Sequence, residues 1–385
     1  MRPLVVLGAT GSIGRQTLEV VNRLGLEVAA VAANRPSPEF ADVVNRYPDA
    51  AAALAGGTDQ ERAFFVASTP GVDFGAEAVT ALAAVPGRIV VNGIVGAAGL
   101  AATLAGLEVG NRVALANKES MVTAGELVIG TASSFGGEVI PVDSEHSALF
   151  QCLVGEHPED VARLILTASG GPFRGRSRAD VVDVTPDQAL RHPTWDMGGR
   201  ITIDSATLVN KGLEVIEAHH MFGIEFDRIV VVVHPQSIVH SAVEFIDGTL
   251  KAHVGHPDMR IPIQYALTYP RRAPGPSEAF DLASQDLLFE PVDRSAFPAL
   301  DLAYEVGRRG GSAPAVYNAA DEVAVDAFLH RRIGFGAITD VVATTVERVA
   351  WHPIATPGDV AAADSEARRV AAGLIAGLSV TARGG

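Results

Sequence analysis

Cysteine is almost absent from the chain, since only Cys152 occurs among its 385 residues. One cysteine cannot form an intrachain disulfide, so the sequence fits a reducing compartment and predicts a cytoplasmic protein. We expect Cys152 to be a small buried helix residue rather than a nucleophile. Long apolar runs are also missing, and no stretch approaches the roughly 20 residues of a membrane span. We expect no targeting peptide, because the chain enters a strand and a glycine turn at once.

Positive charge is scarce as well. The 30 basic residues are outnumbered by 45 acidic ones, which gives a net charge of −15. This balance argues against nucleic acid or an anionic membrane as a partner, and an anionic small substrate would need a local positive site. Only 19% of the residues are charged and 48% are apolar, so the chain can bury a large core in two or three domains.

A glycine-rich turn follows the first predicted strand. Leu4–Leu7 is typical of a buried strand, the sequence Gly-Ala-Thr-Gly-Ser-Ile-Gly occupies residues 8–14, and residues 15–24 have helical spacing. Strand, glycine turn and helix in this order favour a dinucleotide site, because glycines let backbone N–H groups approach a pyrophosphate. The spacing differs from the commoner Gly-x-Gly-x-x-Gly, and such turns also occur for packing alone.

The second predicted strand, Val28–Ala32, is followed by Asn34 and Arg35. Enzymes that use NAD place an acidic residue near this point to bind the ribose hydroxyls. A carboxylate would repel a 2′-phosphate and Arg35 would attract it, so the sequence favours NADP over NAD. The alternative is that Arg35 is an ordinary loop arginine.

Strands and helices continue to alternate, with strands predicted at Glu61–Val66, Arg88–Asn92, Arg112–Ala116 and Glu138–Val142. The third of these ends in the polar sequence 117–120. Ligands bind at the carboxyl ends of strands in open α/β sheets, so this segment is a candidate contact. A capped turn between strand and helix explains the same residues equally well.

Two carboxylates come directly after the strand at 138–142. Asp143 and Glu145 are two residues apart and face the same way in an extended chain. With Glu214 they form a set of oxygen ligands without cysteine, which suits Mg²⁺ or Mn²⁺ rather than structural zinc. The alternative is that Ser144 and Glu145 cap a helix over residues 146–153.

A loop with large apolar side chains is predicted over His192–Arg200. Pro193 disfavours a helix before it, and Gly198-Gly199 loosens its far end. Trp195 and Met197 are unusual in a solvated loop, which suggests a flap that closes on a ligand.

An extended piece is predicted at Ile201–Ile203, followed by a helix with Asp204 or Ser205 as N-cap and Gly223 as C-cap. Gly212 in the middle of this helix indicates close approach of another backbone or of a ligand. The polar strip of the helix is formed by Thr207, Asn210, Lys211 and Glu214. The strip either opens on a site or includes an ordinary surface pair of Lys211 with Glu214.

The middle of the chain predicts an α+β domain. The strand Val161–Thr167 leads into Ser169-Gly-Gly-Pro, which is either a phosphate contact or a tight turn. The apolar segment Ile229–His234 is a further strand. A hairpin turn at Asp247-Gly248 precedes the strand Thr249–Val254.

The C-terminal part has helical spacing in four segments, 299–309, 313–331, 337–351 and 360–378. We therefore predict an α/β protein with a Rossmann-like NADP-binding domain, an α+β catalytic domain and a helical bundle. Their predicted bounds are 1–143, 144–268 with a flap at 192–200, a connector at 269–296, and 297–385.

Eight short motifs occur in order along the chain. They are Gly-Ala-Thr-Gly-Ser-Ile-Gly (8–14), Ala-Asn-Lys-Glu-Ser (116–120), Val-Asp-Ser-Glu-His-Ser (142–147), Ala-Ser-Gly-Gly-Pro-Phe (168–173), His-Pro-Thr-Trp (192–195), Asp-Ser-Ala-Thr-Leu-Val-Asn-Lys-Gly-Leu-Glu (204–214), His-Pro-Gln-Ser-Ile-Val-His-Ser (234–241) and Pro-Asp-Met-Arg (257–260). No single motif is decisive. Together they span nearly the whole chain and closely resemble the 1-deoxy-D-xylulose 5-phosphate reductoisomerase family of non-mevalonate isoprenoid synthesis.

The resemblance implies roles for individual residues. Contacts to NADPH are implied for Thr10, Gly11, Ser12, Ile13, Ala33, Asn34, Arg35, Asn117, Glu119 and Gly198. The implied metal ligands are Asp143, Glu145 and Glu214, and the implied catalytic set adds Lys118 and His192 to them. Substrate contacts are implied for Lys118, Ser144, Glu145 and Glu214, for the flap residues His192 and Trp195, and at the phosphate for Ser169, Ser205, Asn210 and Lys211.

The implied reaction rearranges the carbon skeleton of a small phosphorylated sugar and reduces the resulting aldehyde with NADPH. A divalent cation would stabilise the developing oxyanion, and the flap would exclude water. A homodimer is the expectation of the family. Two other functions stay open: a metal-independent NADP-dependent semialdehyde or polyol dehydrogenase, which the carboxylates disfavour, and a non-catalytic NADPH-binding paralogue.

The chain departs from the family pattern at several positions. The family often has Met-Gly-Arg-Lys where this chain has Gly199 and Arg200 after Met-Gly, so one flap charge is lost. Many relatives have glycine and lysine at Ala33-Asn34, which leaves more of the NADP selectivity to Arg35. Asp321 stands where asparagine is common, and we expect little effect there.

Overall fold

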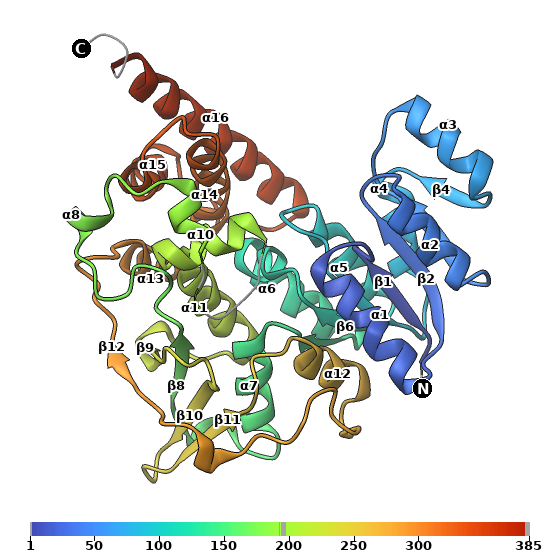
Figure 1. The fold of residues 1–385 in the computed structure, drawn as a ribbon, viewed down its shortest axis with the longest axis horizontal. Helices are drawn as coiled ribbons and strands as arrows, with labels where there is room; N and C mark the ends of the chain where they lie inside the picture. The colour runs from blue at the N-terminus through green and yellow to red at the C-terminus, as the bar shows by residue number, and fades with distance from the viewer. Residues whose placement is uncertain (1, 192, 194–197, 382–385) are drawn as a thin grey trace. The chain divides into compact units, whose positions relative to one another are not determined.

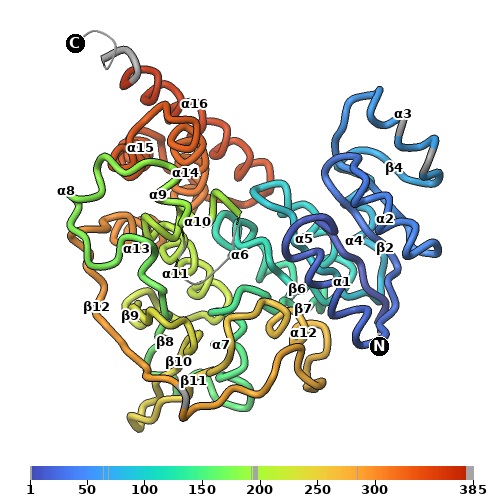
Figure 2. Tube along the Cα trace, viewed as in Figure 1, coloured from blue at the N-terminus to red at the C-terminus, as the bar shows by residue number. Residues whose placement is uncertain are grey.

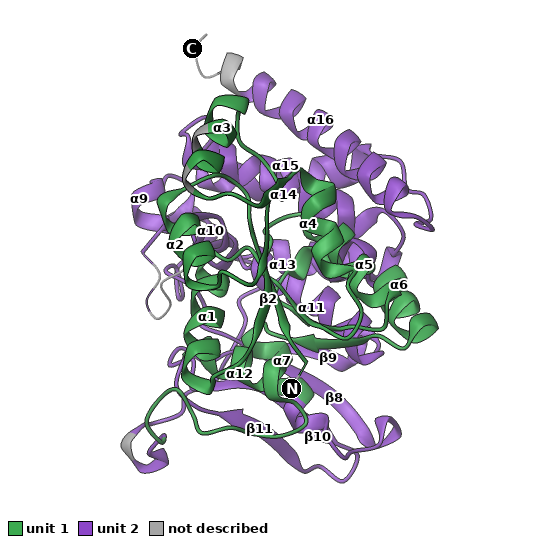
Figure 3. Ribbon diagram, turned by 90° about the vertical axis from the view of Figure 1, so that its right-hand side faces the viewer, with its two compact units in different colours: residues 1–120, 126–150, 258–279 green, residues 121–125, 151–257, 280–385 purple. Residues whose placement is uncertain are grey.

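The computed structural model describes residues 2–191, 193 and 198–381 (Figure 1). The chain divides into two compact units, drawn in two colours in Figure 3. The first comprises Met1–Ser120, Glu126–Phe150 and Asp258–Ala279, and the second comprises Met121–Gly125, Gln151–Pro257 and Phe280–Gly385. In the part of the chain that is described, no helix has the length and apolar character needed to cross a membrane.

The first unit contains a parallel sheet of seven strands in the order β4-β3-β2-β1-β5-β6-β7. The strands are β1 (Leu4–Leu7), β2 (Val28–Ala33), β3 (Ala51–Leu54), β4 (Val72–Phe74), β5 (Ile89–Asn92), β6 (Arg112–Leu115) and β7 (Glu138–Pro141). Strand order reverses between β1 and β5, and open α/β sheets bind ligands at such a point. The sheet confirms the predicted Rossmann-like fold of the N-terminal region.

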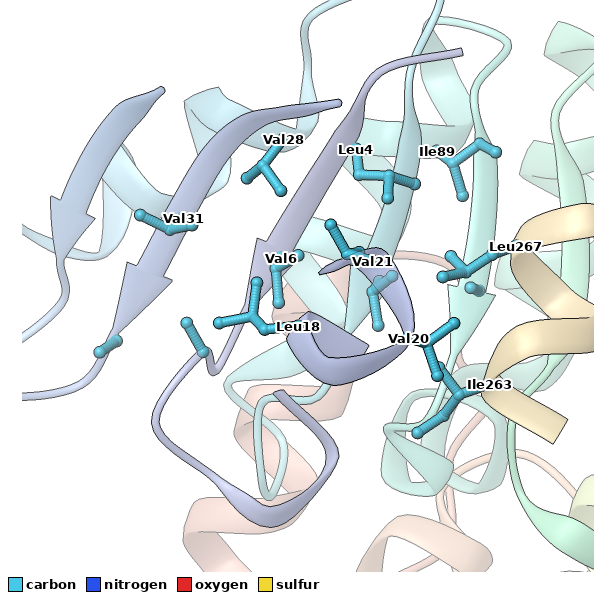
Figure 4. Packing of buried hydrophobic residues seen from close by; sticks show 14 of the residues in the cluster. Leu4, Val6, Leu18, Val20, Val21, Val28, Val31, Ile89, Ile263 and Leu267 are labelled. Atoms are coloured by element: carbon cyan, nitrogen blue, oxygen red, sulfur yellow. The ribbon is translucent and has the colours of Figure 1, made fainter. Parts of the chain in front are cut away.

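Helices cover both faces of this sheet. Figure 3 shows α1 (Ser12–Leu24), α2 (Pro38–Arg46) and α12 (Arg260–Thr268) on one side, and α4 (Ala76–Ala83), α5 (Gly99–Glu108) and α6 (Lys118–Phe135) on the other. The unit also contains α3 (Asp59–Ser68) and α7 (Ser144–Leu153). Helix α12 returns to the unit from late in the chain, and its Ile263 and Leu267 join the core around Val20 of α1 (Figure 4).

The strand predicted at Glu61–Val66 is wrong, because these residues lie inside α3. A capping box starts this helix: Thr58 Oγ1 accepts from Glu61 N at 3.2 Å, and Glu61 Oε2 accepts from Thr58 N at 2.7 Å. The box satisfies backbone donors at the N-terminus and outweighs the strand preference of the Phe-Phe-Val run. Strands β3 and β4 were not predicted, since their alanine-rich and very short sequences carry little strand signal.

The second unit has a mixed sheet in the order β11-β10-β8-β9-β12. Its strands are β8 (Val161–Ala168), β9 (Ile229–Val233), β10 (Val239–Phe245), β11 (Leu250–Val254) and β12 (Glu290–Pro291). Strands β8 and β9 are parallel and the other pairs are antiparallel. The predicted hairpin joins β10 to β11, with Gly248 at φ 82° and Thr249 N donating to Asp247 Oδ1 at 2.8 Å.

The remaining elements of the second unit are helical. They are α8 (Arg178–Val181), α9 (Pro186–Ala189), α10 (Gly199–Thr207), α11 (Val209–Phe222), α13 (Ala299–Arg309), α14 (Ala313–Leu329), α15 (Phe335–Arg348) and α16 (Pro357–Thr381), with 3₁₀ turns η1 (Pro158–Asp160), η2 (Phe226–Arg228) and η3 (Leu282–Ser284). The last four α-helices, orange to red in Figure 2, confirm the predicted helical C-terminal region.

The segment before Gly223 differs from its prediction. Residues 201–203 are helical in α10 rather than extended, and neither Asp204 nor Ser205 caps the next helix. Leu208 breaks the two helices with φ 62°, and α11 then runs to the predicted C-cap. The β-branched run misled the prediction, because its side chains pack as a helix face that buries Thr202 and Ile203. Tertiary packing overrides such weak local preferences.

Gly212 confirms the predicted close approach to α11. A Cβ atom at this position would lie 2.5 Å from Cβ of Ala303 in α13 and 3.3 Å from the Tyr317 hydroxyl. The neighbour is therefore another helix rather than a ligand, and any larger side chain would force α11 and α13 apart.

Candidate active site

The turn between β1 and α1 depends on glycine for its close packing. A Cβ at Gly14 would lie 2.1 Å from Gly8 O, and a Cβ at Gly8, whose φ is 81°, would lie 2.6 Å from Gly93 O. Gly11 begins α1 without a side-chain cap, so the first N–H groups of the helix are left for another acceptor. Such a helix start, next to the point where strand order reverses, is suited to bind a pyrophosphate.

At the end of β2, Ala33 is buried while Asn34 and Arg35 are exposed. Asn34 lies against the next strand connection, since a Cβ at Gly56 would be 3.1 Å from Asn34 Oδ1. The exposed guanidinium of Arg35 is available to a phosphate at this edge of the sheet.

Asn117 caps helix α6 and organises the loop after β5. Its Oδ1 accepts from Ser120 N at 3.0 Å, and its Nδ2 donates to Ile94 O at 2.8 Å and to Gly96 O at 2.9 Å. The same Nδ2 donates to Glu119 Oε2 at 2.9 Å, and both residues are buried. The alternative offered for residues 117–120, a capped turn between strand and helix, is thus present. It fixes the backbone of the loop after β5, beside the point where strand order reverses.

Lys118 and Asp143 form a largely buried ion pair, with Lys118 Nζ 3.0 Å from Asp143 Oδ2. His146 Nδ1 lies 3.8 Å from the other oxygen of Asp143. Burial would raise the pKa of Asp143, but the charge of Lys118 and the nearby His146 outweigh it and hold the pKa well below its usual range. Asp143 is therefore a carboxylate at neutral pH. His146 was not among the predicted site residues, although its position three residues after Asp143 could have suggested it.

Asp143 and Glu145 lie close together, but through a different backbone conformation from the one predicted. The chain is not extended between them, because α7 begins at Ser144. A carboxylate oxygen of each nevertheless lies within 4.8 Å of the other, and Ser144 Oγ donates to Glu145. Two adjacent carboxylates beside one lysine favour a cation between them. Both residues belong to the first unit, whereas Glu214 belongs to the second.

In the second unit, the turn after β8 lies directly against α10. Gly170 and Gly171 have φ 84° and 66°, and Gly171 N donates to Ser169 Oγ at 3.2 Å. A Cβ at Gly171 would be 2.8 Å from Ser205 O, so only glycine allows this approach. The structure thus brings the Ser169 turn and Ser205, both predicted phosphate contacts, to the same place.

The polar strip of α11 is buried rather than solvated. Lys211 and Glu214 are 4% and 1% exposed, and Lys211 Nζ contacts Glu214 Oε2. Asn210 Nδ2 donates to the other oxygen of Glu214. An ordinary surface pair is thereby excluded. A buried lysine and carboxylate held by neighbours one turn away are typical of a functional site.

The predicted flap residues His192 and Trp195 lie outside the described residues. Gly198 is described, and it is the N-cap of α10, with its carbonyl accepting from Thr202 N at 3.1 Å. Arg200, in the first turn of α10, binds Glu322 and Asn318 of α14.

Family models and related proteins all identify the same family for this chain. Three family models match: 1-deoxy-D-xylulose 5-phosphate reductoisomerase over residues 4–125, its C-terminal domain over 139–222, and the DXP reductoisomerase C-terminal domain over 254–370. A reductoisomerase of this name from Moorella thermoacetica is 49% identical over 387 residues, covering 98% of this chain and 99% of the relative. Its counterpart from Desulfitobacterium hafniense (strain Y51) is 48% identical over 351 residues, covering 89% and 91%.

Solved structures agree with the sequence matches. The reductoisomerase from Zymomonas mobilis in complex with NADPH has a TM-score of 0.90 and 43% identity, covering 97% of this chain and 99% of its own. A DOX-P reductoisomerase in complex with NADPH, fosmidomycin and magnesium has a TM-score of 0.91 and 34% identity, covering 98% and 99%.

Proposed function

The chain belongs to the 1-deoxy-D-xylulose 5-phosphate reductoisomerase family, and from this premise we propose the reaction that it catalyses. It rearranges 1-deoxy-D-xylulose 5-phosphate and reduces the product to 2-C-methyl-D-erythritol 4-phosphate, using NADPH and a divalent cation. The observation that carries the proposal is the largely buried pair of Lys118 and Asp143 with Glu145 beside it. A plain dehydrogenase has no need of such a cluster.

The cofactor site is proposed at the switch in strand order of the first sheet. The glycine turn would receive the pyrophosphate, with Thr10, Gly11, Ser12 and Ile13 around it, and the residues after β2 would hold the ribose phosphate, namely Ala33, Asn34 and Arg35. The glycines let the turn pack tightly against its own backbone, and the N-terminus of α1, which has no side-chain cap, would face the phosphates. Asn117 and Glu119 would contribute through the loop that they fix. The bound NADPH supplies the hydride.

The cation is proposed to bind Asp143, Glu145 and Glu214. These groups offer only oxygen, as Mg²⁺ and Mn²⁺ prefer, and Asp143 is ionised. When bound, the cation acts as a Lewis acid toward the substrate's carbonyl and hydroxyl oxygens. Lys118 orients Asp143 and would place a positive charge beside the reacting oxygens, while Ser144 would donate a hydrogen bond there.

The substrate phosphate is proposed to bind Ser169, Ser205, Asn210 and Lys211. Support comes from the contact of the Ser169 turn with Ser205 and from the buried ammonium of Lys211. Lys211 also contacts Glu214, so one lysine would serve both the phosphate and a cation ligand. His192, Trp195 and Gly198 are proposed as the flap that excludes water from the reactive aldehyde.

The test is NADPH oxidation with 1-deoxy-D-xylulose 5-phosphate, with and without Mg²⁺ or Mn²⁺. Wild type, Glu214→Gln and a control, Glu225→Gln, are compared, since Glu225 is exposed on the same unit. Metal-dependent oxidation lost only in Glu214→Gln supports the proposal. Oxidation that persists with a chelator would instead favour the metal-independent dehydrogenase. Tight NADPH binding without turnover would favour the non-catalytic paralogue.

A homodimer and a cytoplasmic location are part of the same proposal. Strand β11 ends its sheet and exposes Leu250 and Val254 by 57% and 38%, and an edge strand of this kind can pair with a second copy. The single cysteine, Cys152, is buried and has no second cysteine in the chain to pair with, which fits a reducing compartment. Light scattering of the purified chain gives the oligomeric state directly.

A further inference from the structure

A network of charged side chains joins α10 to the C-terminal helices within the second unit. Arg200, in the first turn of α10, donates from Nη1 to Glu322 Oε1 at 2.8 Å and from Nη2 to Asn318 Oδ1 at 3.0 Å. Glu322 of α14 also accepts from Arg368 of α16. The start of α10 is therefore tied to two helices.

One turn further along α10, Asp204 faces Asp321 of α14. Asp321 is 0% exposed and Asp204 is 3% exposed. Arg200 serves both, with Nε 3.5 Å from Asp204 Oδ2 and Nη2 3.9 Å from Asp321 Oδ2. Two buried carboxyl groups thus share one guanidinium that Glu322 also engages.

Asp321 lacks the contacts that a buried carboxylate needs. Among the residues that the structure describes, no donor makes a hydrogen bond to either of its carboxylate oxygens. An ionised group at this depth is unfavourable without such donors. A protonated Asp321 needs none, because its O–H donates to Asp204, and the two side chains are in hydrogen-bond contact. Burial first, and then the charge of Asp204, raise the pKa of Asp321 well above its usual value against the opposing effect of Arg200.

We propose that Asp321 is a positioning residue that keeps a proton at neutral pH and donates it in a hydrogen bond to Asp204, which holds α10 in place for substrate binding. The link to substrate rests on the proposed function. Ser205, a proposed phosphate contact, follows Asp204 directly and lies against the Ser169 turn. Ionisation of Asp321 would place two negative charges face to face and push α10 away from α14.

The other titratable groups around Asp204 and Asp321 do not supply a proton to hydrogen-bond these two carboxyl groups. Glu322 is paired with Arg200 and with Arg368, and the latter is itself bound to Asp364 of α16. The Tyr317 hydroxyl donates to Ala299 O at 3.1 Å. Burial, together with the two acidic neighbours, raises the pKa of Tyr317 well above its usual value, so this phenol stays neutral.

The first test is the stability of the full chain as a function of pH, for wild type and Asp321→Asn. The amide can donate to Asp204 but cannot ionise. Above pH 3.8, the ordinary value for Asp, the unfolded chain releases a proton that the folded chain retains. The stability contributed by this group therefore falls as pH rises toward the folded pKa. The unfolding midpoint of Asp321→Asn should exceed that of wild type by a margin that widens with pH.

The matched control is Asp326→Asn, the same change at an exposed position of the same helix. Its pH profile should run parallel to that of wild type. Parallel profiles for wild type and Asp321→Asn would overturn the proposal, because Asp321 would then titrate like any exposed carboxyl group.

The second test separates positioning from mere folding. Asp321→Leu removes the donor, and loss of one hydrogen bond should raise KM for the phosphorylated substrate about fivefold, with kcat largely kept. Asp321→Asn should retain the wild-type KM. A wild-type KM in Asp321→Leu would overturn the positioning role. If that variant does not fold, KM is compared at high pH, where it should rise in wild type and not in Asp321→Asn; equal profiles would overturn the proposal. Absence of turnover in wild type would refute the proposed function alone, because the stability test needs no substrate.

Discussion

Lys118 Nζ lies 3.0 Å from Asp143 Oδ2, and the two side chains are only 10% and 13% exposed. Lys118 begins α6 just after β6, and Asp143 follows β7, the neighbouring strand. The parallel sheet therefore builds the ion pair by aligning two strand ends, and the pair belongs to the proposed active site.

Lys118→Met should abolish most of the activity and destabilise the chain. The variant leaves Asp143 buried without its main counter-charge, which costs about 3 kcal/mol or more. Steady-state kinetics and chemical denaturation measure the two effects. The matched control is Lys251→Met, which breaks an ion pair with Glu156 whose side chains are 40% and 33% exposed. That change should cost about 0–1 kcal/mol and leave turnover intact. Equal losses in both variants would contradict a special role for Lys118.

Gly171→Ala should raise KM for the phosphorylated substrate. Its positive φ and the Cβ contact with Ser205 O at 2.8 Å would force the Ser169 turn away from α10. Gly175→Ala isolates the backbone strain, because Gly175 has φ 79° and no atom within 4 Å of the added Cβ. Strain alone costs about 1–2 kcal/mol. Both variants should be less stable, but only Gly171→Ala should bind substrate poorly. A matching rise of KM in Gly175→Ala would point to strain as the cause.

Arg35→Glu should reduce the preference for NADPH over NADH. The exposed side chain follows β2, where a carboxylate would repel the 2′-phosphate and could accept from the ribose hydroxyls of NAD. A change of about 1.4 kcal/mol corresponds to about tenfold in the ratio of kcat/KM for the two cofactors. Arg46→Glu, exposed on α2, changes the same charge away from the proposed site. An unaltered ratio in Arg35→Glu would remove this residue from the proposed cofactor site.

Acid should destabilise the second unit through His220. Burial, and then the neighbouring His219, lower the pKa of His220 from 6.5 to about 4. The unfolded chain binds this proton below pH 6.5 and the folded chain only below about 4, so stability falls as pH drops through this window. The loss is on the order of 3 kcal/mol. The free energy of unfolding, measured by denaturation, should depend less on pH in His220→Gln than in wild type. The control is His330→Gln, which should keep the wild-type pH dependence, because the His330 side chain is 68% exposed. Identical slopes for wild type and His220→Gln would contradict the assignment.

Local patterns were sufficient for part of the fold. The glycine turn before α1, the hairpin at Asp247-Gly248 and the C-cap at Gly223 were all predicted, because each depends on a backbone conformation that few residues adopt. The prediction of a strand at Glu61–Val66 was wrong, because a capping box stabilises a helix there. The prediction of an extended segment at 201–203 was also wrong. Tertiary packing makes these residues helical, since an apolar β-branched run fits a buried helix as well as a strand.

Some residues of the candidate site were also predicted from the sequence. Asp143, Glu145 and Lys211 were singled out from charge and spacing, and the structure confirms that the first two lie close together and that Lys211 is buried. The proximity of Asp143 to His146 was missed, because it arises from a helix that begins earlier than predicted.

The sequence by itself determined the family, the Rossmann-like plan of the N-terminal region, the helical C-terminal region and the residue types available for cofactor, cation and phosphate. These follow from local chemistry: glycines for close backbone approach, carboxylates for a hard cation, and a lysine for a phosphate. Only the tertiary structure decided which charges meet. The pairing of Lys118 with Asp143 needs two aligned strand ends, and the contact of Asp204 with Asp321 needs two helices packed side by side. Burial then sets whether each carboxyl group is charged, and burial belongs to the whole fold rather than to any stretch of sequence.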